Sequence, residues 1–204
     1  MNFSTKMKTG VASAAAVVAG ASAAHAADAG FAGHDWSGVY VGASLGVMGG
    51  DTPWDEADGY DYKLKSQAAF GGFIGVNHQF HNNMVVGLEA ALQSGGGVDS
   101  ADANNAGDDY NVDHMADVKL KVGTTFGSDN QILAYGFGGL SQMGITAHGN
   151  AYSAVGFNFG LGADYAVSDN FTVGAEVIGR SLTGYKSTGA RFDEQASLRV
   201  AFHF

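Results

Sequence analysis

Apolar and polar residues alternate at every second position through most of this 204-residue chain, which limits the fold to β-structure. Successive side chains of a strand point to opposite faces, so each alternating segment predicts a strand with two different faces. We predict eight strands, at about 37–48, 69–80, 84–94, 115–126, 131–143, 153–166, 171–182 and 193–204. An even number of antiparallel strands can close into an all-β, up-and-down barrel.

The connections between these strands alternate between short and long. Turn-forming Asn, Asp, Gly and Ser are concentrated in the short connections, at 81–83, 127–130 and 167–170. The other four connections are longer and are expected to be loops, at about 49–68, 95–114, 144–152 and 183–192. Short turns at one end and long loops at the other are typical of barrels that cross an outer membrane.

The charged residues indicate which face of the sheet contacts lipid. Four acids and four bases lie opposite a nearly continuous apolar row: Glu89, Asp117, Lys119, Lys121, Asp164, Glu176, Arg180 and Arg199. A soluble carrier barrel would point the apolar row inward, but these apolar side chains are too large and too numerous for an eight-stranded lumen. We therefore predict a transmembrane barrel with a charged lumen. A base facing lipid costs about 2–4 kcal/mol, which excludes a one-residue slip of register.

Two further sets of residues fit this arrangement. Glycines are expected to leave space on the lumen face, at Gly42, Gly75, Gly87, Gly136, Gly138, Gly160, Gly162 and Gly174. Aromatic residues and one methionine near the short turns are expected to form an interfacial girdle on the outer wall, at Trp36, Phe80, Met84, Phe126, Tyr135, Tyr165, Phe171 and Phe204.

An internal repeat relates two predicted hairpins. Residues 75–89 align without a gap on residues 162–176, and the two segments share Gly, the turn Asn, Val, Gly and Glu at equal spacing. Equivalent hairpins in equivalent geometry explain the match, and a duplication is not needed. The repeat supports the predicted strand and turn boundaries.

Buried charges need partners, so the lumen charges are expected to form a network. Four of them lie five residues from the short-turn end of their strands and should be at one height. We predict that Glu89 pairs with Lys121 and Glu176 with Arg199, with Arg180 closer to the loops. The predicted network comprises Glu89, Lys119, Lys121, Glu176, Arg180 and Arg199. Its functional alternative is a proton or ion path.

The N-terminal residues predict a secretory signal peptide. Lys6 and Lys8 precede an apolar, Ala-rich run at 11–24, and small residues stand three and one before a cut after Ala26. We predict a signal peptide at 1–26 and a barrel domain at 27–204. An N-terminal amphipathic helix is the alternative.

The last predicted strand ends the chain on an aromatic residue. Alternate residues of this strand are expected to face lipid, namely Leu198, Val200, Phe202 and Phe204. A terminal strand that ends in Phe resembles the signal that the outer-membrane barrel assembly machinery reads. We therefore expect that machinery to be a partner of the chain.

Several strand segments together resemble a known family. The segments at 36–46, 75–92, 133–140 and 155–177, with the terminal Phe204, are similar to small outer-membrane β-barrel proteins of the opacity and immunogenic surface-protein type. The resemblance covers nearly the whole mature chain and implies the outer membrane of a Gram-negative bacterium, with membrane lipid and lipopolysaccharide as surroundings. It departs from the family at residues 75–77, Gly-Val-Asn in place of Gly-Tyr-Asn, and at Phe171 in place of Trp.

The sequence gives little support for catalysis. No histidine is followed two positions later by a serine, so the signal for lipid A deacylation is missing. His114 with Asp108, Asp109 and Asp113 could supply metal ligands, but an acidic loop in water explains them equally well, and we expect no enzyme activity, metal or cofactor.

The two long acidic loops suggest where the chain meets other molecules. Residues 49–68 and 95–114 together hold ten acids, which disfavours nucleic acid as a partner. We expect a structural or surface-interaction role through four extracellular loops, which could bind an extracellular ligand. The alternatives are a narrow ion or small-solute channel and, third, a lipid A-modifying enzyme.

Overall fold

The computed structural model describes residues 33–51, 62–94, 98–100, 110–147, 150–183 and 191–204. The predicted signal peptide, at 1–26, lies outside the described residues. The described strands are β1 (Gly38–Asp51), β2 (Tyr62–Gln79), β3 (Met84–Ser94), β4 (Val98–Ser100), β5 (Tyr110–Phe126), β6 (Ile132–Ala147), β7 (Asn150–Ala166), β8 (Phe171–Thr183) and β9 (Arg191–His203). Among the described residues, no helix has the length and hydropathy needed to cross a membrane.

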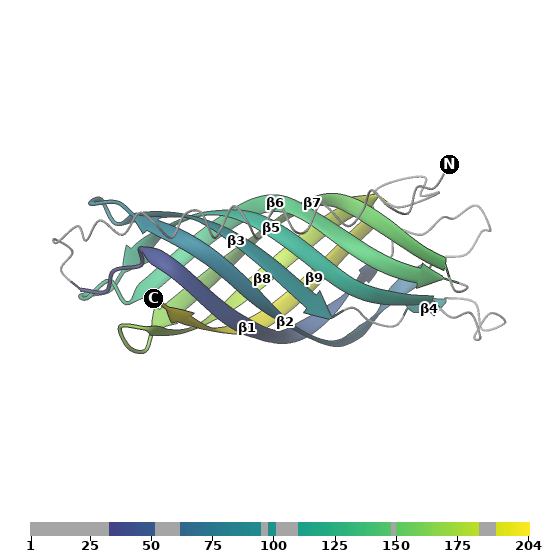
Figure 1. Cartoon of the computed structure of the whole chain (residues 1–204), viewed down its shortest axis with the longest axis horizontal. Coiled ribbons are helices and arrows are strands. Elements are labelled where there is room, and N and C mark those ends of the chain that lie inside the picture. The colour runs from purple at the N-terminus through teal and green to yellow at the C-terminus, as the bar shows by residue number, and fades with distance from the viewer. Residues whose placement is uncertain (1–32, 52–61, 95–97, 101–109, 148–149, 184–190) are drawn as a thin grey trace.

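Eight of these strands form a closed antiparallel barrel (Figure 1). Each strand pairs with its neighbours in the chain, and β1 closes the sheet by pairing with both β2 and β9. The short strand β4 lies outside this set of eight and, among the described residues, pairs with the start of β2, at Tyr62–Leu64. The prediction of an eight-stranded antiparallel barrel is confirmed.

The strands extend further toward the loops than the sequence predicts. The strand β2 begins at Tyr62, β5 begins at Tyr110, and β6 and β7 leave only residues 148–149 between them. The prediction of four long loops is therefore wrong for the third, at 144–152. Backbone pairing continues where the alternation of apolar and polar residues has faded, since ladder hydrogen bonds do not depend on side-chain type.

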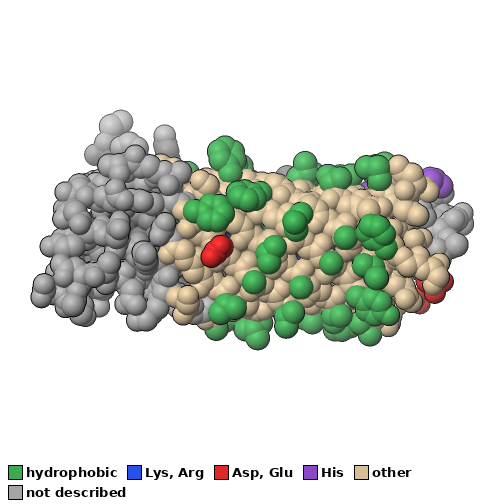
Figure 2. Space-filling model, turned by 180° about the vertical axis from the view of Figure 1, so that it is seen from behind, with side chains coloured by type: hydrophobic (Ala, Val, Ile, Leu, Met, Phe, Trp, Pro, Cys, Tyr) green, Lys and Arg blue, Asp and Glu red, His purple; other side chains and the backbone are tan. Residues whose placement is uncertain are grey.

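The two faces of the barrel wall differ as the charge pattern predicts. Along β5, Asp117, Lys119 and Lys121 are buried in the lumen, whereas Val118 and Leu120 between them are exposed on the outer wall. Hydrophobic side chains are distributed over the outer surface between the two ends of the barrel (Figure 2). A wall of this kind can contact lipid, because its polar groups are enclosed.

The strand β6 reverses one predicted assignment. Tyr135 and Phe137 point into the lumen, and Gly136 and Gly138, which alternate with them, lie on the outer face, so these two glycines are not lumen residues. The register of β6 could not be set from sequence because the strand carries no charge. The rings of Phe137 and Tyr135 contact Lys119 and Lys121 in the lumen, and these contacts explain why the two aromatic side chains point inward.

Two predicted girdle residues are also placed differently. Trp36 is 0% exposed and Tyr135 is 4% exposed, and both lie inside the barrel. The remaining six are 41–67% exposed on the outer wall, as predicted: Phe80, Met84, Phe126, Tyr165, Phe171 and Phe204.

The segment before β1 closes the short-turn end of the lumen. The amide of His34 donates to the carbonyl of Asp129 at 2.7 Å, and the indole Nε1 of Trp36 donates to the carbonyl of Asn130 at 2.8 Å. The amide of Trp36 donates to Oε1 of Gln79 at 2.9 Å. These hydrogen bonds hold the indole of Trp36 inside the lumen, where it packs in one buried cluster with Val85, Leu133, Tyr135, Phe137, Ala166 and Ile178. We call Trp36 and this cluster the turn-end plug.

A second apolar cluster fills the lumen at the loop end. It consists of Met48, Ala69, Val112, Met115, Met143, Ala154 and Leu182, and we call it the loop-end plug. Three of its members are methionines, whose unbranched side chains fill irregular space well. The charged residues of the lumen lie between the loop-end plug and Trp36, and three members of the turn-end plug reach in among them: Tyr135 and Phe137 beside Lys121 and Lys119, and Ile178 between Glu176 and Arg180 on β8.

Candidate functional site: the charge network of the lumen

Glu89 is the centre of the lumen network and is almost fully buried on β3. Its carboxylate accepts hydrogen bonds from Lys119 Nζ at 3.2 Å, Lys121 Nζ at 3.3 Å and Arg199 Nη1 at 3.0 Å. Arg199 Nη2 and the hydroxyl of Tyr40 donate to the same carboxylate, at 2.5 and 2.9 Å. A buried carboxylate tolerates this position because cations and donors replace the water it has lost.

Glu176 on β8 binds two of the same cations. Lys119 Nζ and Arg199 Nη1 both contact its carboxylate at 2.5 Å, and the hydroxyl of Tyr135 donates to it at 3.2 Å. The two contacts expected from sequence, Glu89 with Lys121 and Glu176 with Arg199, are present. They are not separate pairs, however, because Lys119 and Arg199 each bridge both carboxylates.

Asp164 balances the charge of this layer. Its carboxylate lies 3.9 Å from Lys121 Nζ and 3.9 Å from Arg199 Nε. With Asp164, the layer contains three carboxylates and three cations, and we call these six residues the lower layer: Glu89, Asp164, Glu176, Lys119, Lys121 and Arg199. Equal numbers of opposite charges reduce the cost of enclosing them in the barrel.

Aromatic rings cover the cations of the lower layer. Lys121 Nζ lies 3.9 Å from the ring centre of Tyr135, and the guanidinium carbon of Arg199 lies 4.0 Å from that of Phe73. Lys119 Nζ lies 4.8 Å from the ring centre of Phe137. These distances are within the range of cation–π attraction, which is strongest where water is excluded.

Tyrosine, glycine and glutamate form the same unit twice in the lower layer. Tyr40 lies opposite Gly75 and donates to Glu89, and Tyr135 lies opposite Gly162 and donates to Glu176. A Cβ atom at either glycine would overlap the ring of the facing tyrosine. The internal repeat of the sequence therefore preserves both the glycine that admits the ring and the glutamate that the ring binds.

Arg180 organises a second layer closer to the loops. Its Nε and Nη2 donate to the two oxygens of Asp117, at 2.9 and 2.7 Å, and its Nη1 lies 3.4 Å from Asp193 Oδ1. Gln195 and Gln93 extend this layer, since Arg180 Nη2 donates to Gln195 Oε1 at 3.3 Å and Gln93 Nε2 donates to Asp117 Oδ2 at 3.2 Å. We call these residues the upper layer.

Of the upper layer, the predicted network included only Arg180. Asp117, like Asp164 of the lower layer, was placed on the lumen face but not in the network, and Asp193, Gln93 and Gln195 were not assigned at all, although Asp193 and Gln195 have the same parity as Arg199 in the last strand. That parity was available from sequence. The partner that each side chain reaches could not be predicted from sequence, because it depends on the stagger between strands.

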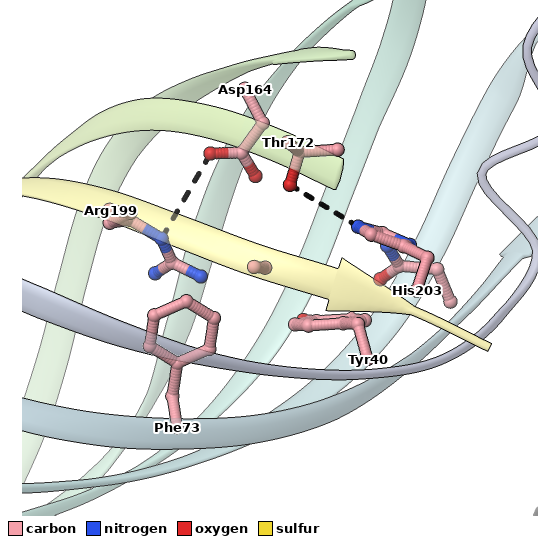
Figure 3. A pocket seen from close by; sticks show the side chains of 8 residues that line it. Tyr40, Phe73, Asp164, Thr172, Arg199 and His203 are labelled. Carbon is pink, nitrogen blue, oxygen red and sulfur yellow. Dashed lines mark hydrogen bonds and ion pairs between the residues drawn. The ribbon is translucent and has the colours of Figure 1, made fainter. Parts of the chain in front are cut away.

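A small cavity lies beside the lower layer, toward the turn-end plug. Its volume is about 10 Å³, and Tyr40, Phe73, Asp164, Arg199 and His203 are among its lining residues (Figure 3). Figure 3 shows Arg199 directed toward Asp164, and His203 toward Thr172. The space is about that of one water molecule, so it is a pocket within a packed lumen rather than a pore.

The terminal strand β9 carries the predicted assembly residues on its outer face. All four point away from the lumen and are exposed: Leu198, Val200, Phe202 and Phe204. The amide of Phe204 donates to the carbonyl of Val39 at 3.0 Å, so the last residue is tied to β1 at the seam of the barrel.

The acids and histidines of the lumen are the side chains from which a metal site could be built. No group of three or more His, Cys, Asp or Glu side chains among the described residues is placed to hold a metal ion. Asp108 and Asp109, which the sequence offered as ligands with His114, lie outside the described residues. The acids of the lumen bind cationic side chains, an arrangement that stabilises a structure.

Comparison with known proteins assigns the chain to a family. Residues 13–204 match the family model described as the outer membrane protein beta-barrel domain. The chain is 26% identical to the 31 kDa outer-membrane immunogenic protein of Brucella melitensis, and to that of Brucella suis, over 70% of this chain and 70% of each relative.

Solved structures show the same fold. Neisserial surface protein A superposes with a TM-score of 0.52 at 16% identity, covering 82% of this chain and 98% of that one. The attachment invasion locus protein of Yersinia pestis superposes with a TM-score of 0.50 at 15% identity, covering 82% and 99%. The family match, the outer-membrane relatives and the closed barrel with its apolar wall agree, and the chain belongs to the family of outer-membrane β-barrel proteins of Gram-negative bacteria.

Proposed function

We propose that this protein is a structural, non-conducting barrel of the outer membrane that presents its loops to the surroundings of the cell. The observation that carries the proposal is the filling of the lumen. Two apolar clusters and two layers of ion pairs together fill the lumen, and Trp36 and Arg180 are each 0% exposed. A solute entering from either end would have to displace packed side chains.

The network supports a structural role for a second reason. Lys119 and Arg180 each contact carboxylates from two other strands, and Arg199 contacts carboxylates from three, so the layers tie together strands that are not neighbours in the sheet. Removing such a side chain would leave buried charge unpaired. The network therefore holds the barrel in a single arrangement, which a platform for loops requires.

The acidic loops support the interaction part of the proposal. Ten acids are located at 49–68 and 95–114, against two lysines. Such loops would attract cationic surfaces and divalent cations and would repel nucleic acid. A cationic extracellular partner is the class that this charge favours.

Planar-bilayer recording of the purified mature protein tests the structural proposal. We expect no conductance above leak from the wild type. The variant Trp36→Ala, which removes the centre of the turn-end plug, serves as a comparison that is expected to raise the frequency of brief openings. Reproducible unitary conductance from the wild type would overturn the proposal and favour the second candidate.

The second candidate function is a narrow channel. It is favoured by the cavity beside Arg199, where Arg199 Nε, Asn77 Oδ1 and His203 Nδ1 have no hydrogen-bond partner among the described residues. These atoms could bind water or pass a small ion if the plugs opened. A deletion strain separates the candidates further, since loss of envelope integrity and of surface binding, with unchanged small-solute uptake, supports the structural role.

Catalysis is not part of the proposal. Mass spectrometry of lipid A from the deletion strain is expected to give the profile of the parent strain. A changed acyl or phosphate pattern that a plasmid copy restores would contradict this expectation.

A further inference from the structure

Glu194 is an acidic side chain on the outer wall of the barrel. It is exposed on β9, between the outward-facing Phe192 and Ala196, whereas the carboxylates of both lumen layers point inward. It was not among the charges assigned from sequence. Figure 2 shows an acidic side chain among hydrophobic ones on the wall, toward the end of the barrel that is drawn in grey.

Glycines flank Glu194 on both neighbouring strands. Gly179 of β8 and Gly49 of β1 are its cross-strand partners. The rings of Phe192 and Phe159 cover the place where a side chain of Gly179 would begin, at 2.6 and 3.4 Å from a Cβ there, and their centres are 5.8 Å apart. The carboxylate is therefore beside an aromatic wall, with no side chain directly across from it on either strand.

The surface beside Glu194 is hollowed into a furrow. One hollow of about 530 Å³ contains Glu194, and a second of about 500 Å³ reaches Leu198. The two hollows share Val47, Leu161, Val177 and Ala196, so they form one continuous furrow on the outer wall. Apart from Glu194 its surface is mainly apolar, and its length follows the strands from the loop side toward the middle of the barrel.

The height of Glu194 suits a lipid head group. Ten residues separate it from Phe204 in the girdle at the other end. At a rise of about 3.3 Å per residue and a tilt of about 40°, this spacing places Glu194 roughly 25 Å above Phe204, at the upper edge of an apolar band about 25 Å tall. Leu198, at the lower end of the furrow, is then near the middle of the acyl region.

We propose that this furrow binds a single amphiphile with an ammonium group in its head and an acyl chain below it. The ammonium would lie at Glu194, and the chain would lie against Leu161, Val177 and Ala196. Within the described residues, no basic side chain lies within ion-pair distance of the Glu194 carboxylate. At the edge of a low-dielectric region this charge favours a cationic partner, and the furrow favours an apolar chain.

Native mass spectrometry of the full mature chain, released from neutral maltoside micelles, tests the proposal. The probes are dodecylammonium, dodecanol and dodecyl phosphate at equal concentrations, the last with and without Mg²⁺. We expect dodecylammonium to bind with one-to-one stoichiometry and with about tenfold higher affinity than dodecanol. The variants are Glu194→Gln, which removes the charge, and Ala196→Leu, which fills the furrow.

Both variants are expected to lower the affinity for dodecylammonium about tenfold. The control Asp169→Asn removes an exposed acid at the short-turn end and is expected to leave binding unchanged. Equal binding by wild type and Glu194→Gln would overturn the proposal. Glu194-dependent binding of dodecyl phosphate only with Mg²⁺ would also overturn it, since the ligand would then be a divalent cation shared with a phosphate. Neither result depends on whether the lumen conducts.

Discussion

Arg180 binds Asp117 through two hydrogen bonds, from Nε to Oδ1 at 2.9 Å and from Nη2 to Oδ2 at 2.7 Å. The two residues are on β8 and β5, which are not neighbours in the sheet, so the contact crosses the lumen. A two-bond contact between guanidinium and carboxylate fixes both the distance and the angle between its partners. The contact therefore fixes the distance between β5 and β8 on opposite sides of the lumen at the height of the upper layer.

Asp117→Ala should strongly destabilise the barrel. Removal of one partner leaves the buried Arg180 with only Asp193 and Gln195, and breaking a buried ion pair costs about 3–5 kcal/mol. The measurement is the free energy of unfolding from urea titration in lipid or detergent. The double variant Asp117→Leu with Arg180→Met removes both charges and is expected to be more stable than Asp117→Ala. A loss below 1 kcal/mol in the single variant would contradict the assigned role of the pair.

Leu198→Arg should test which face contacts lipid and at what depth. Leu198 is 69% exposed on the outer wall and lies roughly 15 Å above Phe204, close to the middle of the apolar band. A base at this depth is expected to cost about 2–4 kcal/mol of unfolding free energy in a bilayer, and the control Phe192→Arg near the edge about 0–1 kcal/mol. Equal costs for the two variants would contradict the depth assigned here.

The sequence predicts the strands and most of the faces because charge and alternation act at the same positions. Asp117, Lys119 and Lys121 set the register of β5, since a slip would bring them into lipid. Where a strand lacks a charge, this signal is missing. For β6 the strand was therefore predicted, but its two faces were reversed: Gly136 was expected in the lumen and lies outside, and Tyr135 was expected outside and lies in the lumen.

The site was predictable as a set of residues but not as a set of contacts. Parity alone places Glu89, Glu176 and Arg199 in the lumen. Which carboxylate each cation reaches depends on the stagger of the closed barrel, which is why two separate pairs were expected where one network exists. Trp36 was misplaced because it precedes the first strand, where alternation gives no information about direction.

Acid should weaken the turn-end plug through His34. Burial of this side chain lowers the pKa of His34 below its ordinary value of 6.5, although nearby Asp169 and Asp35 act in the opposite direction. The folded state then favours the neutral imidazole, and the unfolded chain takes up the proton first as pH falls below about 6.5. The stability that this group contributes is present above that pH and is lost below it.

Thermal unfolding at pH 7.5 and 5.5 measures the effect of His34. We expect the wild type to lose more stability on acidification than His34→Gln, which cannot titrate at that position. The ring of His34 also lies 6.2 Å from that of His203, so His203→Gln is the companion control for a second titrating group. An identical pH dependence in wild type and His34→Gln would contradict the prediction.

Phe204→Ala should lower the amount of protein assembled in the outer membrane without preventing folding in detergent. The side chain of Phe204 is exposed on the outer wall, and the hydrogen bond that its backbone amide donates to the carbonyl of Val39 does not require the ring. Phe171→Ala is the matched control, because Phe171 is an exposed aromatic at the same end of the neighbouring strand and pairs with Phe202. Immunoblots of outer-membrane fractions and refolding yields in detergent are measured together. If the ring of Phe204 is read by the assembly machinery, only its variant loses assembly in cells, whereas equal losses for both variants would indicate a general effect on the girdle.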